Sequence, residues 1–204
     1  MKMKRIVFAL VVMLFALAAS AAESAGAFLD RVAGRLKSAP RLLAAYVLTT
    51  DGVSQSGTLT VEGNMFVLDS GELASWYDGK TQWTYSAQTG ETTVTEPTAE
   101  EVAQINPFAI IAAFRRNYNA SFLPSASGVK KVKLTAKARG SDISTVVVTV
   151  SEKSLDPSEI VLTMASNQVI LIRIKSLRNV AKLPASTFRY DPKSYPGVEV
   201  IDLR

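Results

Sequence analysis

The chain has 204 residues, with 23 Lys and Arg against 18 Asp and Glu, and it contains neither His nor Cys. These absences exclude Ser-His and Cys-His nucleophiles, zinc sites built on His or Cys, and disulfide bonds. An enzyme would depend on carboxylates, Lys or Tyr alone, so we expect a protein that is not an enzyme and that holds no metal or cofactor.

The first 22 residues have the three-part layout of a secretory signal. Three cations within residues 2–5 precede an apolar run over 6–17, and small residues follow up to Ala22. The run is shorter than the roughly 20 residues that span a bilayer, so we expect cleavage after Ala22 and a periplasmic protein. Without the signal's three cations the net charge falls from +5 to +2, which gives no indication of nucleic-acid binding.

The first half of the remaining chain changes from a helical period to a strand period. Residues 24–38 carry one apolar stripe and end before Pro40, which predicts a helix. Alternating patterns then predict a strand over 41–50, a hairpin over 56–70, a second hairpin over 72–86 and a strand over 90–96. The two hairpins turn at Gly63-Asn64 and Asp78-Gly79.

The strand pattern breaks at Pro97 and returns later. Thr98 and Glu101 form a capping box at the start of a predicted helix over 98–104, and Pro107 suits the first turn of another over 105–118. Further strands are predicted over 129–139, 142–152, 158–166, 168–179 and 198–203.

This order of elements predicts a mainly β fold with helices. So many strands in one chain tend to curl, so we expect an unclosed antiparallel β-barrel of about 10–11 strands, with an N-terminal helix and inserted lid helices. No linker divides the chain, so we expect one domain over residues 23–204 and a monomer.

The stretch "YDGKTQWTY" over residues 77–85 contains Gly-Lys-Thr, which suggests a phosphate-binding loop. That loop needs an earlier Gly where this chain has Ala74, and it opens a helix, whereas a strand pattern follows here. The Asp78-Gly79 pair therefore predicts a hairpin turn.

Two other patterns are also better explained without catalysis. Ser127 and Lys130 have Ser-x-x-Lys spacing, but Gly128 and a strand follow rather than a helix. Glu100 and Glu101 are adjacent, so on a helix they diverge and do not face one site.

A basic strand stands out in the second half of the chain. Its cations are Lys130, Lys131, Lys133, Lys137 and Arg139. The alternation with apolar residues favours a solvated sheet face. A patch for an acidic partner or a membrane surface is the alternative.

We expect aromatic and aliphatic residues of the hairpins to face the predicted helices. We expect the concave face to be lined by Leu59, Val61, Phe66, Leu68, Trp83 and Tyr85. The lid contacts would be Phe108, Ile111 and Phe114. Such surfaces either pack shut or enclose a ligand, and a slip of one residue in strand phase would invert the lining.

Several segments together resemble the periplasmic lipoprotein carriers, the LolA-like proteins. "DGKTQWTY" matches a turn of that family closely, and "INPFAII" resembles the start of its lid helix. The other similar segments are "RLLAAYVLTT", "SGTLTV", "GNMFVLD", "GETTVTE" and "FRYDPKSYPGVEVIDLR".

The resemblance implies an unclosed barrel whose cavity takes the acyl chains of lipoproteins. The carrier would receive them from an inner-membrane ATP-driven transporter and pass them to an outer-membrane acceptor. Where many members carry an Arg-Pro pair linked to holding the lid closed, this chain has Glu62-Gly63-Asn64, so the lid is latched otherwise or the cargo or partner differs.

Two alternatives differ in class from a carrier. One is a periplasmic lipid-sensing or regulatory module that binds one partner protein. The other is a hydrolase that uses carboxylates or Lys.

Overall fold

A computed structural model describes residues 22–204, and the expected signal over 1–22 lies outside this range except for Ala22. Within residues 22–204 no helix is both long and apolar enough to cross a membrane. Ser24 is the N-cap of helix α2 (Ala25–Ser38). Its hydroxyl oxygen accepts a hydrogen bond from the Ala27 N–H at 3.2 Å.

The first six strands form consecutive antiparallel pairs, as the alternating patterns predict. Their bounds are β1 (Leu42–Thr50), β2 (Val53–Glu62), β3 (Met65–Asp69), β4 (Leu73–Tyr77), β5 (Gln82–Ser86) and β6 (Glu91–Thr95). The predicted turns at Gly63-Asn64 and Asp78-Gly79 are confirmed, and both glycines have positive φ.

Two helices follow β6, as expected. In α3 (Ala99–Ile105) the capping box is complete, since the Thr98 N–H donates to Glu101 Oε2 at 2.7 Å and the Glu101 N–H donates to Thr98 Oγ1 at 3.3 Å. In α4 (Pro107–Asn117) the Asn106 side chain accepts from the Phe108 N–H at 3.2 Å.

The second half of the chain contributes six strands. They are β7 (Tyr118–Leu123), β8 (Val129–Ala136), β9 (Ile143–Ser151), β10 (Pro157–Met164), β11 (Val169–Asn179) and β12 (Glu199–Asp202), with short 3₁₀ helices η1 (Ala185–Phe188) and η2 (Pro192–Ser194) before the last. Strand β7 was not predicted. It lies at the sheet edge with only Tyr118 buried, so its sequence lacks a clear apolar alternation.

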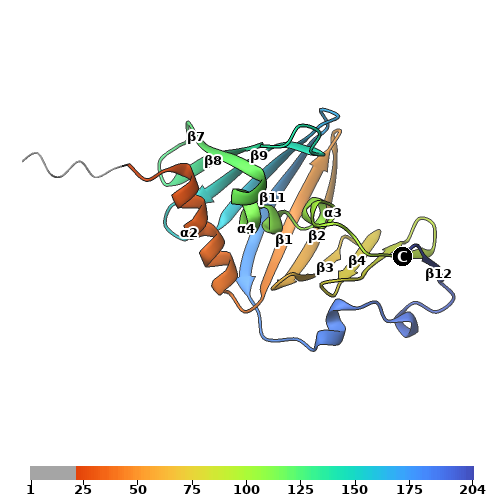
Figure 1. The fold of residues 1–204 in the computed structure, drawn as a ribbon. Helices are drawn as coiled ribbons and strands as arrows, with labels where there is room; N and C mark the ends of the chain where they lie inside the picture. The colour runs from red at the N-terminus through yellow and green to blue at the C-terminus, as the bar shows by residue number, and fades with distance from the viewer. Residues whose placement is uncertain (1–21) are drawn as a thin grey trace, which may run out of the picture.

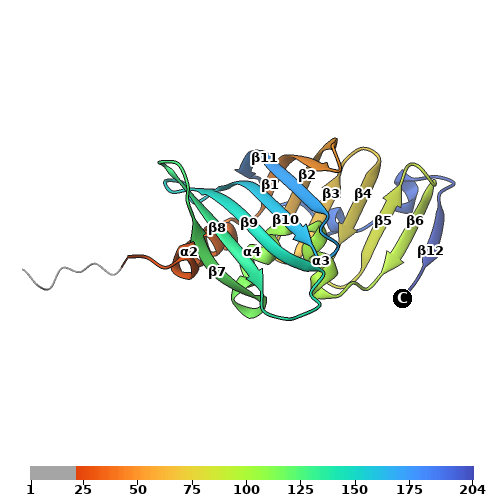
Figure 2. The ribbon, with the colours of Figure 1, turned by 90° about the horizontal axis from the view of Figure 1, so that it is seen from above.

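The strands form one sheet in the order β12-β6-β5-β4-β3-β2-β1-β11-β10-β9-β8-β7. The two halves of the chain meet where β1 pairs with β11 (Figures 1 and 2). Within residues 22–204, only β12 runs parallel to its neighbour, β6, and the edge strands β7 and β12 do not pair with each other. The expected unclosed antiparallel barrel with helices is therefore confirmed, with twelve strands.

The core lies between one face of this sheet and the helices. Apolar residues of β8, β9 and β10, such as Leu134, Val146 and Ile160, are fully buried together with α2 and α4. Helices α3 and α4 connect β6, next to one edge of the sheet, to β7 at the opposite edge, so the chain crosses the concave face (Figure 2). We call α3 and α4 the lid helices.

Candidate binding cavity

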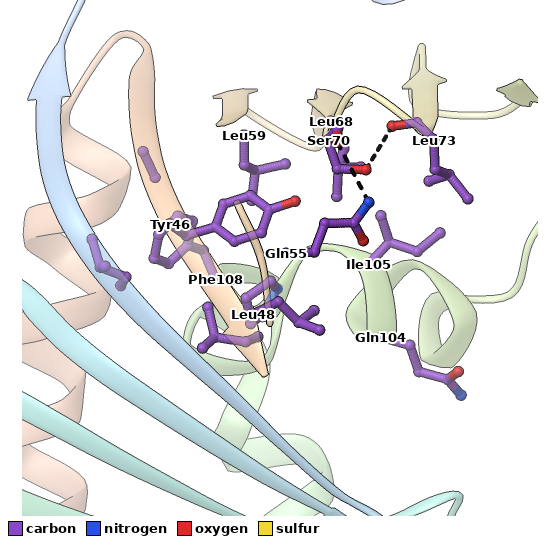
Figure 3. Close-up of a pocket in the computed structure, with 14 residues that line it drawn as sticks. Tyr46, Leu48, Gln55, Leu59, Leu68, Ser70, Leu73, Gln104, Ile105 and Phe108 are labelled. Atoms are coloured by element: carbon purple, nitrogen blue, oxygen red, sulfur yellow. Dashed lines mark hydrogen bonds between the residues drawn. The ribbon is translucent and has the colours of Figure 1, made fainter. Parts of the chain in front are cut away.

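An apolar pocket lies between the lid helices and the middle of the sheet. Its volume is about 230 Å³, and strands β1 to β4 and β11 contribute to it together with α3 and α4. Leu48, Leu59, Leu68, Ile172 and Phe108 make its wall largely hydrocarbon (Figure 3). We call it pocket A.

Polar side chains gather at one side of pocket A. The Gln55 amide nitrogen donates to the Ser70 carbonyl oxygen at 3.4 Å, and the Ser70 hydroxyl donates to the Leu73 carbonyl oxygen at 3.0 Å (Figure 3). Gln104 of α3 lines the same pocket. An apolar wall with a few polar groups at one side suits an amphiphilic ligand.

A second pocket, pocket B, lies between α2, α4 and the β2–β3 turn. Its volume is about 330 Å³, and Leu36, Val61, Asn64 and Ala112 are among its lining residues. Phe108 lines both pockets and is 5% exposed. The Phe108 ring therefore stands between two apolar spaces.

Seven of the nine residues expected in the cavity or lid lie on the concave side. Leu59, Leu68 and Phe108 line pocket A, and Val61 lines pocket B. The others pack in the core: Phe66, whose ring lies 5.4 Å from that of Tyr77, and the lid residues Ile111 and Phe114. Contact of these residues with lipid stays a prediction.

Trp83 and Tyr85 were assigned to the wrong face. Trp83 pairs with Trp76, and Tyr77 beside Trp76 faces the core with Phe66, so successive side chains place Trp76 and Trp83 on the convex face. By the same alternation Tyr85 shares that face.

The C-terminal segment supplies the partners of these aromatics, which sequence reasoning missed. The Tyr195 ring lies 4.7 Å from Tyr85 and 5.5 Å from Trp76, and Tyr190 lies 5.5 Å from Trp76. This aromatic cluster is a packing contact between distant parts of the chain, and three Pro in the segment are the only sequence signal of its irregular course.

Tyr46 is a pocket residue that sequence reasoning did not single out. It pairs with Gly57 across β1 and β2, and its ring extends into pocket A beside Leu59 (Figure 3). Burial, and then the charge of Asp69, raises the pKa of the Tyr46 phenol, so the phenol stays neutral. A glycine opposite an aromatic residue leaves room for its ring, and this pair is the signal that could have identified Tyr46.

Gly57→Ala is therefore expected to destabilise the protein by about 1–3 kcal/mol, the usual cost of overpacking. A Cβ at this position would lie 2.6 Å from the Tyr46 hydroxyl oxygen and 2.8 Å from the Asp69 carbonyl oxygen. Urea denaturation measures the change. The control is Gly34→Ala in α2, where a Cβ meets nothing within 4 Å and helix propensity predicts a gain of up to about 1 kcal/mol. Equal effects at both sites would contradict this account.

Polar ties between the lid helices and their surroundings are exposed. Arg115 of α4 pairs with Asp30 of α2, with Nε 2.8 Å from Oδ1, and this hydrogen bond lowers the pKa of Asp30. On α3, the Gln104 amide nitrogen donates to Asp142 Oδ2 at 3.3 Å. Exposed pairs of this kind contribute at most about 1 kcal/mol, so burial of apolar side chains holds the lid in place.

Glu62 has a buried partner. It forms an ion pair with Arg41, whose side chain is 1% exposed. Arg41 Nη1 donates to the Ala181 carbonyl oxygen at 2.6 Å, and its guanidinium lies 5.6 Å from the Phe188 ring centre. The pair fastens the C-terminal segment to the start of β1.

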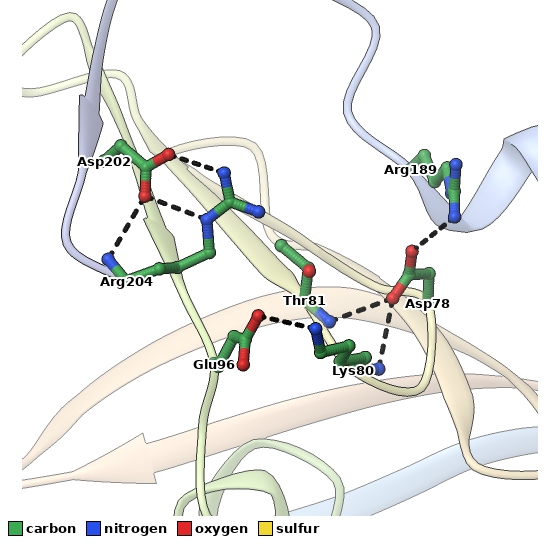
Figure 4. A network of polar contacts seen from close by, with 7 residues as sticks. All are labelled: Asp78, Lys80, Thr81, Glu96, Arg189, Asp202 and Arg204. Atoms are coloured by element: carbon green, nitrogen blue, oxygen red, sulfur yellow. Dashed lines mark hydrogen bonds and ion pairs between the residues drawn. The ribbon is translucent and has the colours of Figure 1, made fainter.

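The Gly-Lys-Thr stretch belongs to a polar turn (Figure 4). Asp78 Oδ1 accepts from the N–H groups of Lys80 at 3.1 Å and Thr81 at 2.9 Å, and its Oδ2 lies 2.9 Å from Arg189 Nη2. Burial raises the pKa of Asp78, but these hydrogen bonds and Arg189 outweigh it and lower the pKa. Lys80 pairs with Glu96 at 3.1 Å, so the turn joins the C-terminal segment to the approach to α3.

Comparison with known proteins gives one family and several similar structures. Residues 15–167 match the family described as Outer membrane lipoprotein carrier protein LolA. No curated protein matches the sequence.

Solved structures resemble this fold at low sequence identity. An uncharacterized conserved protein from Thermus thermophilus is 11% identical with a TM-score of 0.56, over 86% of this chain and 96% of its own. A DUF1329 family protein from Desulfovibrio piger is 10% identical with a TM-score of 0.52, over 85% and 100%. A LolA superfamily protein from Nitrosomonas europaea is 14% identical with a TM-score of 0.45, over 84% and 100%.

Proposed function

The chain belongs to the outer membrane lipoprotein carrier (LolA) family, and from this premise we propose that it carries lipoprotein acyl chains through the periplasm. The observation that supports the proposal most directly is pocket A, an apolar space under a lid that has only weak polar ties. Acylated lipoproteins would bind there without catalysis. An inner-membrane transporter would supply them and an outer-membrane acceptor would take them.

The mature carrier would be a monomer of residues 23–204, with the signal of residues 1–22 removed. Within residues 22–204 the chain forms one continuous sheet. A single sheet that both halves of the chain build supports one domain.

The size of the pockets agrees with reversible carriage. Burying an acyl chain contributes about 0.8 kcal/mol of binding free energy per methylene, so burial of three chains with about forty methylenes would contribute roughly 30 kcal/mol. Reversible binding reaches only about 20 kcal/mol. Pockets A and B, of about 230 and 330 Å³, hold far less than three chains, so cargo has to displace the lid and offset the cost of doing so.

Photo-cross-linking tests where cargo binds. A photoreactive residue at Leu68 or Phe108, introduced into the full chain in cells, is expected to capture periplasmic lipoproteins, since both side chains line pocket A. The control is Trp83 on the convex face, which should give no lipoprotein adduct. Adducts from Trp83 alone would contradict the proposal, and capture of one fixed non-acylated protein would favour the regulatory module instead.

A further inference from the structure

The charges of the chain separate by sequence into two blocks. Residues 51–106 contain one Lys and nine Asp or Glu, whereas residues 107–184 contain twelve Lys or Arg and four Asp or Glu. The net charges are therefore −8 and +8, although the expected mature chain carries only +2. The small net charge therefore contains two large and opposite charges in different parts of the sequence.

The fold turns these blocks into two halves of one sheet. The acidic block forms β2 to β6 and α3, and the basic block forms α4 and β7 to β11. Strand β1 lies between β2 and β11, so the boundary runs along the middle of the sheet (Figure 2). We call residues 107–184, which include α4 and β7 to β11, the basic half.

Most cations of the basic half are free to act on a partner. Within residues 22–204, three of the twelve form ion pairs with carboxylates: Arg115, Lys130 and Arg173. Lys131 and Lys133 lie on the convex face, because Val132 and Leu134 between and beyond them point into the core. The other nine have no ion-pair partner in this range.

We propose that the basic half is a docking surface for anionic phospholipid bilayers. Seven of its twelve cations are Lys, which protein–protein interfaces disfavour relative to Arg. The cations are spread over strands, loops and α4 rather than gathered around an aromatic anchor. A diffuse set of Lys suits a laterally uniform negative surface, where each contributes about fivefold to affinity.

The polarity also orients the carrier. An anionic bilayer attracts β7 to β11 and repels β2 to β6, and pocket A lies at the boundary with walls from β1, β2 and β11. Because Lys131 and Lys133 lie on the convex face and pocket A lies on the concave side, the docked molecule would hold pocket A on the side of the sheet away from the bilayer. The inference rests on charge alone and does not need cargo in the cavity.

Vesicle co-sedimentation of the cargo-free mature chain tests this docking. The protein is expected to bind vesicles of phosphatidylglycerol and phosphatidylcholine in equal parts, and to bind phosphatidylcholine vesicles far more weakly. Lys131→Glu with Lys133→Glu should weaken binding by at least about 20-fold, since each lost Lys removes about fivefold and each Glu adds repulsion. Added salt should weaken binding of the wild type.

The matched control is Lys80→Glu with Lys193→Glu, which makes the same change in net charge outside the basic half. It should change binding much less. Equal binding to both vesicle types, or equal loss in both double variants, would overturn the proposal. The proposal would also be overturned if the wild-type protein failed to bind vesicles and light scattering showed that it self-associates through Lys131 and Lys133. None of these results would alter the cross-linking from Leu68.

Discussion

Glu62→Leu is expected to lower the free energy of unfolding by about 3–5 kcal/mol, because it leaves Arg41 charged and unpaired in the interior. Arg41 is 1% exposed, and within residues 22–204 its Nε already has no hydrogen-bond partner. Urea denaturation of the mature chain measures the change. Limited proteolysis should also cut earlier near Ala181, whose carbonyl Arg41 holds.

A double variant separates the charge from the packing. Arg41→Met combined with Glu62→Leu should recover most of the loss, because a buried ion pair can be replaced by apolar side chains at little cost. Glu159→Leu removes the partner of Arg173, whose side chain is 57% exposed, and should cost under about 1 kcal/mol. If Glu62→Leu lowers the free energy of unfolding as little as Glu159→Leu does, the Arg41 guanidinium is hydrated.

Phe108→Ala is expected to make the protein less stable and yet a tighter binder of acyl chains. Removing a buried Phe costs about 3–5 kcal/mol, and here it also joins pockets A and B. The lost contact weakens lid closure, which competes with cargo, and about 1.4 kcal/mol is already a factor of ten in affinity. Titration with a fluorescent fatty acid should therefore show binding at least about tenfold tighter.

The control for this result is Leu134→Ala. Leu134 is fully buried in β8 and lines neither pocket, so its truncation should cost about 2–5 kcal/mol without changing acyl-chain affinity. Tighter binding in both variants would attribute the effect to general loosening. Weaker binding in Phe108→Ala would mean that the ring contacts cargo more than it blocks entry.

Local signals predicted much of this fold. The Thr98–Glu101 capping box, the turns at Gly63 and Gly79 and the N-terminal helix all depend on residues a few positions apart, and all appear in the structure. Strand β7 escaped prediction because an edge strand buries little and so needs little apolar alternation.

The site was less predictable because it depends on contacts between distant segments. The C-terminal segment packs on the convex face, where the Tyr195 ring lies 4.7 Å from Tyr85, and Arg41 meets the Ala181 carbonyl 140 residues away. No local pattern distinguishes an aromatic that faces a cavity from one that packs under a returning chain. The concave positions of Leu59 and Leu68 follow from alternation once the register is known.

The pairing of β1 with β11 has a consequence for how the protein matures. Leu42 finds its partner Asn179 near the opposite end of the chain, so the central strand of the sheet keeps an open edge until almost the whole polypeptide is available. Long-range pairing of this kind slows folding, and an open strand edge invites aggregation. A chain that is synthesised from its amino terminus therefore passes through a vulnerable half-sheet, and assistance by a holding chaperone would act during that interval.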